Sequence, residues 1–382
     1  MAVLTRLFEL MAQKKASDLF VSAGAPIHIK INGNSVPVNP QVMSADDTKK
    51  VCYEILKPHQ IERLEKDLEL NFSMPLEGVG NFRVNMLWQK GSCAAVIRYI
   101  ESNIPEFRSL MLPQVLAQVV MEKRGLILVV GATGSGKSTT LASMLDFRNS
   151  MKQGHILTFE DPIEYIFTSK KSIVNQREIG NDSHSFGEAM RNAMRQAPDC
   201  ILVGEIRDIE TMKAAMMYSL SGHLCLATLH ANNSYHALNR IINFFPLDQR
   251  TILLSDLGVS LRCIISQRLV KNVEGGRSAA VEVLMNTTNI AELIEEGKVG
   301  EIKEAMEKSL TPGSQTFEQD LFRLIKQEKI TVEEGLGNAD SATNLSLLIG
   351  NSGMMPVYKD GQAPPEKGRQ PGSASFSEFK IS

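Results

Sequence analysis

The chain has 382 residues, 43% of them hydrophobic and 22% charged, and its formal net charge of −2 argues against a strongly basic nucleic-acid-binding surface. Its five cysteines form no CxxC pair, and its apolar runs are far shorter than the roughly 20 residues of a membrane-spanning helix, so we expect no disulfide framework, no zinc site and no transmembrane segment. The sequence therefore predicts a cytoplasmic protein of two or three domains whose membrane association, if any, is peripheral.

The first hundred residues predict a small α+β domain, residues 1–101. Apolar residues alternate with polar ones on both sides of the turn dipeptide Asn32-Gly33, which indicates a β-hairpin. Ser44 has the hydroxyl of a helix N-cap and precedes an acidic first turn, and Pro58 interrupts the helix that follows. The expected elements are a helix over residues 1–15 without a signal-peptide pattern, a hairpin over 27–38, a helix over 44–56, and strands over 82–88 and 94–100.

The pattern loosens over residues 102–113, where two prolines make this segment the expected interdomain linker. Short apolar runs then alternate with helical stretches over residues 114–349, which is typical of a parallel sheet with helices on both faces. Residues 350–382 are rich in Gly, Pro and Ser, so we expect a disordered tail. The expected strands of the sheet are residues 126–130, 156–159, 201–203 and 224–229.

The segment from Gly131 to Ser138 reads GATGSGKS and fits the phosphate-binding pattern GxxxxGK[ST], with an expected strand before it and a helix after it. Its glycines allow backbone N–H groups to turn around an anion, and the helix N-terminus adds a favourable dipole. We expect Lys137 to contact the β- and γ-phosphates of ATP, and Ser138 to bind Mg²⁺. The predicted nucleotide-binding residues are Gly131, Thr133, Gly134, Ser135, Gly136, Lys137, Ser138, Thr139, Glu160 and Asp161.

Carboxylates follow the next expected strand, at Glu160, Asp161 and Glu164. The carboxyl ends of parallel strands face the ligand crevice of such a sheet, where acids act as a base for water or complete a metal's coordination shell. A solvated acidic loop is the alternative interpretation.

The strand at residues 201–203 leads into Gly204-Glu205, so a glycine stands where many ATPases have a metal-binding Asp. Glu205 is therefore our candidate for holding Mg²⁺ indirectly or orienting water. Arg207-Asp208 is open to reading as a surface ion pair. His230 ends the fourth expected strand, and the sequence leaves open whether it senses the γ-phosphate or is structural.

The motifs GATGSGKS, TFEDPIEY, ILVGEIRD and GHLCLATLH, in this order, resemble those of the secretion and type IV pilus ATPases, and most closely the PilT/PilU retraction family. The resemblance implies a PAS-like N-terminal domain, a RecA-like core, and a homo-hexameric ring that binds ATP between the two domains. It also implies that Glu164 is the catalytic base, Glu205 the Walker B glutamate and His230 the His-box residue. It further implies that Arg83 and Arg98 stabilise transferred charge; without it, each is read as a strand-surface charge.

Two departures favour the PilU branch of this family. The Ala-Ile-Arg-Asn-Leu-Ile motif of PilT proteins is replaced by Asn289-Ile-Ala-Glu-Leu-Ile294, so the arginine has become Ala291, and the C-terminal extension is absent from shorter PilT proteins. The resemblance implies a motor for pilus retraction and twitching motility, accessory to a PilT-type ATPase and docked on an inner-membrane platform protein. The alternatives are a coupling subunit whose own hydrolysis is dispensable and a DNA-translocating secretion ATPase. The near-neutral charge predicts no nucleic-acid partner.

Overall fold

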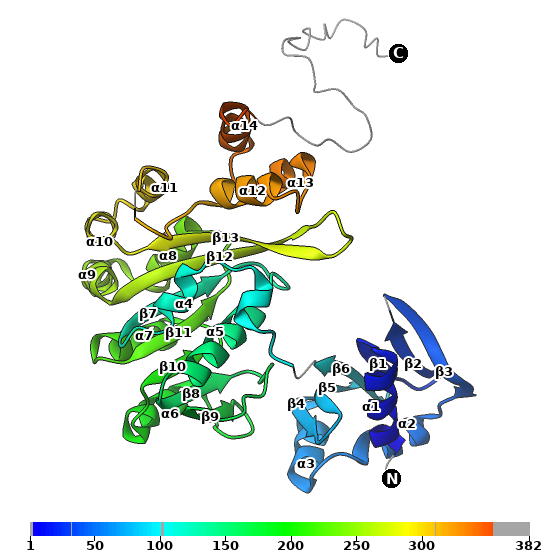
Figure 1. Cartoon of the computed structure of the whole chain (residues 1–382). Helices are drawn as coiled ribbons and strands as arrows, with labels where there is room; N and C mark the ends of the chain where they lie inside the picture. The colour runs from blue at the N-terminus through cyan, green and yellow to red at the C-terminus, as the bar shows by residue number, and fades with distance from the viewer. Residues whose placement is uncertain (1–2, 32, 101–102, 310, 354–382) are drawn as a thin grey trace, which may run out of the picture. The chain divides into compact units, whose positions relative to one another are not determined.

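The computed structural model describes residues 3–31, 33–100, 103–309 and 311–353 (Figure 1). The chain divides into two compact units. The first contains residues up to Leu269 together with Ala279–Thr316, and the second contains Val270–Ser278 and the chain from Phe317 onward. Among the described helices, none is long and apolar enough to cross a membrane.

The N-terminal part of the first unit is a six-stranded sheet in the order β3-β2-β1-β6-β5-β4, antiparallel throughout. Phe8 of the first helix stacks on Phe82 of β5 with ring centroids 4.3 Å apart, at the centre of the core of this part. The predicted α+β domain class is confirmed. The elements are α1 (Val3–Lys14), β1 (Asp18–Val21), β2 (Pro26–Ile31), β3 (Asn34–Val42), α2 (Ala45–Tyr53), α3 (Pro58–Asp67), β4 (Glu69–Leu76), β5 (Gly80–Gln89) and β6 (Ser92–Ile100).

The predicted cap and hairpin are confirmed. The Ser44 hydroxyl accepts a hydrogen bond from Asp47 N, and β2 pairs with β3 in an antiparallel register; Asn32 of the turn lies outside the described residues. The end of the predicted helix over 44–56 is wrong, because α2 ends at Tyr53. Pro58 does more than interrupt a helix, since it occupies the first turn of α3, where its missing N–H costs nothing.

The second sheet has seven strands in the order β13-β12-β7-β11-β10-β8-β9, and every neighbouring pair from β12 to β9 is parallel (Figure 1). Every residue of β7 is buried, as expected for a central parallel strand. Leu128 packs with α6–α9 on one face and Val129 with α4 and α5 on the other. The strands are β7 (Gly125–Val130), β8 (Gly154–Glu160), β9 (Ser172–Glu178), β10 (Cys200–Val203), β11 (Leu224–Leu229), β12 (Leu261–Lys271) and β13 (Arg277–Met285).

The helices of the first unit that accompany this sheet confirm the predicted α/β layering. They are α4 (Val115–Val119), α5 (Lys137–Met151), α6 (Phe186–Ala193), α7 (Ile209–Leu220), α8 (Ser234–Phe244), α9 (Arg250–Ser260), α10 (Thr288–Glu295) and α11 (Ile302–Glu307). The second unit contains α12 (Phe317–Lys326), α13 (Val332–Asn338) and α14 (Ala342–Asn351) around Phe317 and Leu345.

Two segments bear on the predicted domain boundaries, which stay a prediction. Residues 107–110 of the expected linker form a 3₁₀ turn, and the buried Phe107 ring packs on Phe147 of α5 at 5.7 Å. At the other end, α14 extends to Asn351, two residues into the expected tail. Residues 354–382 of that tail lie outside the described residues.

Candidate nucleotide-binding site

Four neighbouring parallel strands, β7, β8, β10 and β11, end at one edge of the seven-stranded sheet. Val203 lies opposite both Phe159 and Ala227, and Leu229 lies opposite Val130, so the strand ends are nearly level. The GATGSGKS motif directly follows β7, and each of the other three motifs contains the end of β8, β10 or β11. The sheet therefore brings together residues that are separated by up to a hundred positions in the chain.

The loop from Gly131 to Ser138 connects β7 to α5, which begins at Lys137. Gly134 and Gly136 have φ angles of 77° and 89°, in the left-handed region that favours glycine. A Cβ atom at Gly136 would lie 2.7 Å from the side-chain nitrogen Nε2 of Gln267 on β12, so a side chain there would displace that amide group. The Ser135 hydroxyl is buried and has no hydrogen-bond partner among the described residues. The loop is thus shaped for backbone contact with an anion.

Lys137 is only 9% exposed, and its Nζ donates to the carbonyl oxygens of Gly131 at 2.9 Å and Ala132 at 3.0 Å. Burial lowers the pKa of this ammonium, while the charges of Glu205 and Glu164 act in the opposite direction. The cation is held within the loop by carbonyl oxygens that are weaker partners than a phosphate.

Ser138 and Thr139 lie in the first turn of α5. The Thr139 hydroxyl is 2.8 Å from the hydroxyl of Tyr165, which ties the helix start to the segment after β8. Thr133 lies in the turn between the two loop glycines Gly131 and Gly134.

Glu160 ends β8 and is 8% exposed. Its Oε1 accepts hydrogen bonds from Thr158 Oγ1 at 2.7 Å and Gln176 Nε2 at 3.2 Å. Burial raises the pKa of the Glu160 carboxyl to about 7, and the two hydrogen bonds oppose this shift. Glu160 is thus a buried carboxyl at the end of β8, whereas the next residue, Asp161, is exposed.

We predict that Glu160→Gln stabilises the protein at alkaline pH. Because the folded state binds the Glu160 proton more tightly than the unfolded state, its stabilising contribution is full below about pH 4.5 and is lost as the pH rises through about 7. Glutamine keeps the accepting oxygen without the ionisation. The gain in unfolding free energy, measured in urea, should grow from little at pH 5 to as much as about 3 kcal/mol at pH 8, at 1.36 kcal/mol per pKa unit. The prediction is contradicted if the gain in unfolding free energy is the same at pH 5 and pH 8. It is also contradicted if the exposed control Glu188→Gln gives an equal gain.

Glu205 and His230 meet at the ends of β10 and β11. His230 Nε2 lies 3.2 Å from Glu205 Oε1, and the Arg207 guanidinium contacts Glu205 Oε2 at 2.8 Å. The guanidinium also reaches Asp161 Oδ2 at 3.4 Å, and its two acidic partners raise the pKa of Arg207. Glu205 and His230, which the sequence analysis proposed separately, therefore lie in contact with each other.

Gly204 explains why no acid precedes Glu205. Its N–H donates to Phe159 O at 2.7 Å, and a Cβ atom there would lie 3.1 Å from that oxygen and 3.2 Å from Glu160 Cα. An aspartate at this position would press against the backbone of β8. The close approach of the two strands therefore favours glycine at this position.

Arg83 and Arg98 occupy opposite positions on the β5 and β6 pair. Arg83 Nη2 lies 3.3 Å from Glu164 Oε1, which brings these two predicted residues together. Arg98 is instead 61% exposed at its side chain, and its Nε donates to Asp18 Oδ1 at 2.9 Å. Within one chain, therefore, Arg98 contacts Asp18 and not Glu164.

Several polar residues of this region were missed from the sequence. Gln176 on β9 donates to both Glu160 and the Tyr165 carbonyl, at 3.2 and 2.8 Å. Gln267 on β12 accepts from Thr140 at 2.7 Å, under the phosphate loop. Both strands carry alternating or mixed polar residues, so neither resembles the continuous apolar runs that revealed the other strands.

A family model described as "Type II/IV secretion system protein" matches residues 1–334 of the chain. The chain belongs to this family. It is 45% identical over 345 residues to the type IV pilus ATPase PilU of Pseudomonas aeruginosa, covering 90% of each chain. It is 40% identical over 341 residues to the PilT retraction ATPase of the same organism, covering 89% of this chain and 99% of PilT.

Solved structures give the same assignment. The crystal structure of the pilus retraction motor PilT with bound ADP matches with a TM-score of 0.84 and 41% identity, over 91% of this chain and 99% of that one. The Legionella pneumophila ATPase DotB matches with a TM-score of 0.76 and 26% identity, over 91% and 95%. The RecA-like core of a secretion ATPase, preceded by an antiparallel sheet domain, is thus confirmed, and the chain is an ATPase of this family.

The residues present fit ATP and a divalent cation. The unpartnered Ser135 hydroxyl and the glycines at positive φ form a cradle for phosphate oxygens. Ser138, at the start of α5, supplies the hydroxyl that phosphate loops place on Mg²⁺. Among the described residues, no group of three or more His, Cys, Asp or Glu side chains could hold a metal ion.

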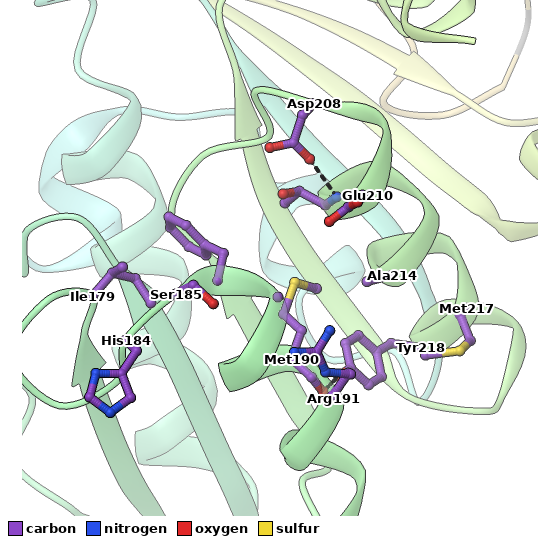
Figure 2. A pocket seen from close by; sticks show the side chains of 13 residues that line it. Ile179, His184, Ser185, Met190, Arg191, Asp208, Glu210, Ala214, Met217 and Tyr218 are labelled. Atoms are coloured by element: carbon purple, nitrogen blue, oxygen red, sulfur yellow. Dashed lines mark hydrogen bonds between the residues drawn. The ribbon is translucent and has the colours of Figure 1, made fainter. Parts of the chain in front are cut away.

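A separate cavity of about 550 Å³ lies between α6 and α7 (Figure 2). Asp208, on its wall, caps α7 by accepting a hydrogen bond from Thr211 N at 2.8 Å, directly after Arg207. Arg191 and His184 also line it. None of the predicted site residues lines this cavity, so it is not part of the phosphate site.

Proposed function

We propose that the chain is an ATP-hydrolysing motor that promotes type IV pilus retraction, as a homo-hexamer that assists a PilT-type ATPase. In this proposal the ring docks on an inner-membrane pilus platform protein and is cytoplasmic. The observation that carries the proposal is the meeting of the phosphate loop, Glu205 and His230 at one sheet edge. The identities to PilU and PilT over nearly the whole of each relative support the pilus assignment.

In the proposed mechanism, Lys137 leaves the two loop carbonyls and donates to the β- and γ-phosphates. Bound Mg²⁺ would neutralise charge on these phosphates, with the Ser138 hydroxyl as its protein ligand. Glu164 accepts the proton of the attacking water, and Arg83 beside it at 3.3 Å holds the carboxylate in place. Glu205, fixed by Arg207 on one oxygen, orients His230 with the other.

The accessory role rests on two features. Ala291 lies in α10 where PilT proteins carry an arginine, so this helix lacks a cation at that position. The identity to PilU, 45%, also exceeds the 40% to PilT.

Arg98, held by Asp18 and exposed, would reach a nucleotide only on another subunit of a ring.

The proposal is tested by steady-state hydrolysis of ATP with Mg²⁺, comparing wild type with Glu164→Ala and recording the oligomeric state in the same buffer. Removing a general base should lower kcat by about 10²–10⁴-fold. The exposed Glu62→Ala serves as the matched control and should leave kcat unchanged. The motor proposal is supported if the wild type hydrolyses ATP as a ring and the Glu164→Ala variant loses this hydrolysis.

Tight nucleotide binding without turnover by the wild type overturns the motor proposal. It favours instead a coupling subunit that links a PilT-type ATPase to the machine, for which the replacement at Ala291 is the supporting observation.

A further inference from the structure

The start of α8 is bonded to a buried carboxylate that the family motifs do not contain. Glu282 on β13 is 3% exposed, and its Oε1 accepts hydrogen bonds from Ser234 N at 2.8 Å, Ser234 Oγ at 2.7 Å and Ser266 Oγ at 3.0 Å. Both serines are themselves buried. Three donors converge on one oxygen in the interior, where leaving any of them unpaired is costly.

Each donor belongs to a segment that borders the candidate site. Ser234 is the first residue of α8, four positions after His230. Ser266 on β12 pairs with Val130, the last residue before the phosphate loop. One carboxylate oxygen therefore joins the strand beside the phosphate loop to the segment that carries His230.

The segment between His230 and Ser234 is short and its backbone is held at further points. Arg240 donates to the His230 carbonyl at 3.0 Å, and Arg268 donates to the Asn232 carbonyl at 3.2 Å. The Glu282 bond to Ser234 fixes the far end of the same segment. Loss of the Ser234 bonds would therefore release one of three points that hold the segment carrying the His230 imidazole, which lies 3.2 Å from Glu205.

We infer that Glu282 is a positioning residue for ATP hydrolysis, acting through Ser234 on His230 and through Ser266 on the strand next to the phosphate loop. This inference rests on the proposed ATPase activity. It places Glu282 outside contact with the nucleotide, so its effect falls on kcat rather than on the KM for ATP. A displacement of about 1 Å in a group that orients the reaction is enough for a large loss in rate.

The first test replaces Ser234 with alanine, which removes one donor and leaves its N–H bond to Glu282. Loosening the segment that carries His230 should lower kcat roughly fivefold, with KM within about twofold. The matched control is Ser260→Ala, because the buried Ser260 hydroxyl has no hydrogen-bond partner within the described part of the chain. A fall in kcat equal to that of the control overturns the inference.

A double variant separates positioning from general stability. If Ser234 acts through His230, Ser234→Ala causes no further fall in kcat when His230 is already alanine. Multiplying losses in the double variant overturn the inference. Glu282→Gln keeps an accepting oxygen and should retain kcat within about threefold, whereas Glu282→Leu, which strands three donors, should lose at least about tenfold among the molecules that remain folded.

Hydrogen exchange of the amides of residues 231–233 gives a readout that does not require turnover. Exchange should be faster in Ser234→Ala and Glu282→Leu than in wild type and the Ser260 control, and unchanged exchange overturns the inference. If the wild type shows no turnover but exchange is still faster in Ser234→Ala and Glu282→Leu, the proposed activity is rejected. The positioning of the segment by Glu282 is then retained.

Discussion

Replacing Lys137 with methionine should lower ATP turnover by about 10²–10³-fold, the cost of removing one preorganised group from a developing charge. Methionine fills much of the same buried space as the lysine stem, so the loop around Gly131 keeps its packing. The change removes only the ammonium and its bonds at 2.9 and 3.0 Å to the loop carbonyls.

The same substitution should leave the folded state at least as stable as wild type. Burial lowers the pKa of the Lys137 ammonium, which means that the fold disfavours this charge in the absence of an anion. Loss of activity without loss of stability is therefore the expected pair of results, measured as kcat and as the urea midpoint.

Lys308→Met is the matched control, because Lys308 is an exposed lysine paired with Glu304 four residues before it. It should change neither quantity. A Lys137→Met variant that retains more than about a tenth of wild-type kcat contradicts the assignment of this loop as the phosphate site.

The central strands were predictable because the sequence alone marks what is buried on both faces. Residues 126–130 and 224–229 are continuous apolar runs, and both became fully buried parallel strands. By contrast, β9 carries Asn175, Gln176 and Arg177 on the edge of the sheet, and its pairing depends on β8 rather than on local pattern. Edge strands with polar faces give no such signal, which is why β4 and β9 were missed.

The position of the loop from Gly131 to Ser138 between a strand and a helix was predictable because the motif is local, with glycines and a lysine at fixed spacing. The partners of Glu205 were not. Arg207 was open to interpretation as a surface pair with Asp208, but Asp208 caps α7 and Arg207 turns to Glu205 instead. The Asp208 cap is a local contact over three residues, whereas the contact of Arg207 with Asp161 spans 46 positions and forms only in the folded chain.

Buried hydrogen bonds between residues that are far apart in the sequence were the least predictable part. Glu282 is an isolated acid in an apolar strand of the sequence, and nothing nearby suggests that Ser234 and Ser266 meet it. Contacts over 48 and 16 positions arise only once β12, β13 and α8 are placed together. Buried hydrogen-bonded groups of this kind need the fold before they can be found.

Glu205→Ala should reduce kcat for ATP about 10²–10³-fold, on the scale of losing a group that orients the reacting atoms. The carboxylate contacts the Arg207 guanidinium at 2.8 Å and His230 at 3.2 Å, so its removal takes this contact from His230 and leaves Arg207 with its contact to Asp161. His230→Ala should cost less, because Arg207 still fixes Glu205. The double variant should be no worse than Glu205→Ala alone, since residues in direct contact are not additive.

These variants also decide between a motor and a coupling subunit when pilus retraction is measured under load in cells. A motor that supplies work loses retraction force in Lys137→Met and Glu205→Ala alike, because both variants are expected to lower ATP turnover by at least about 100-fold. The exposed Glu301→Ala should retain full force. Unchanged force in both hydrolysis variants would mean that nucleotide turnover by this chain is dispensable, which favours the proposed coupling subunit over the motor.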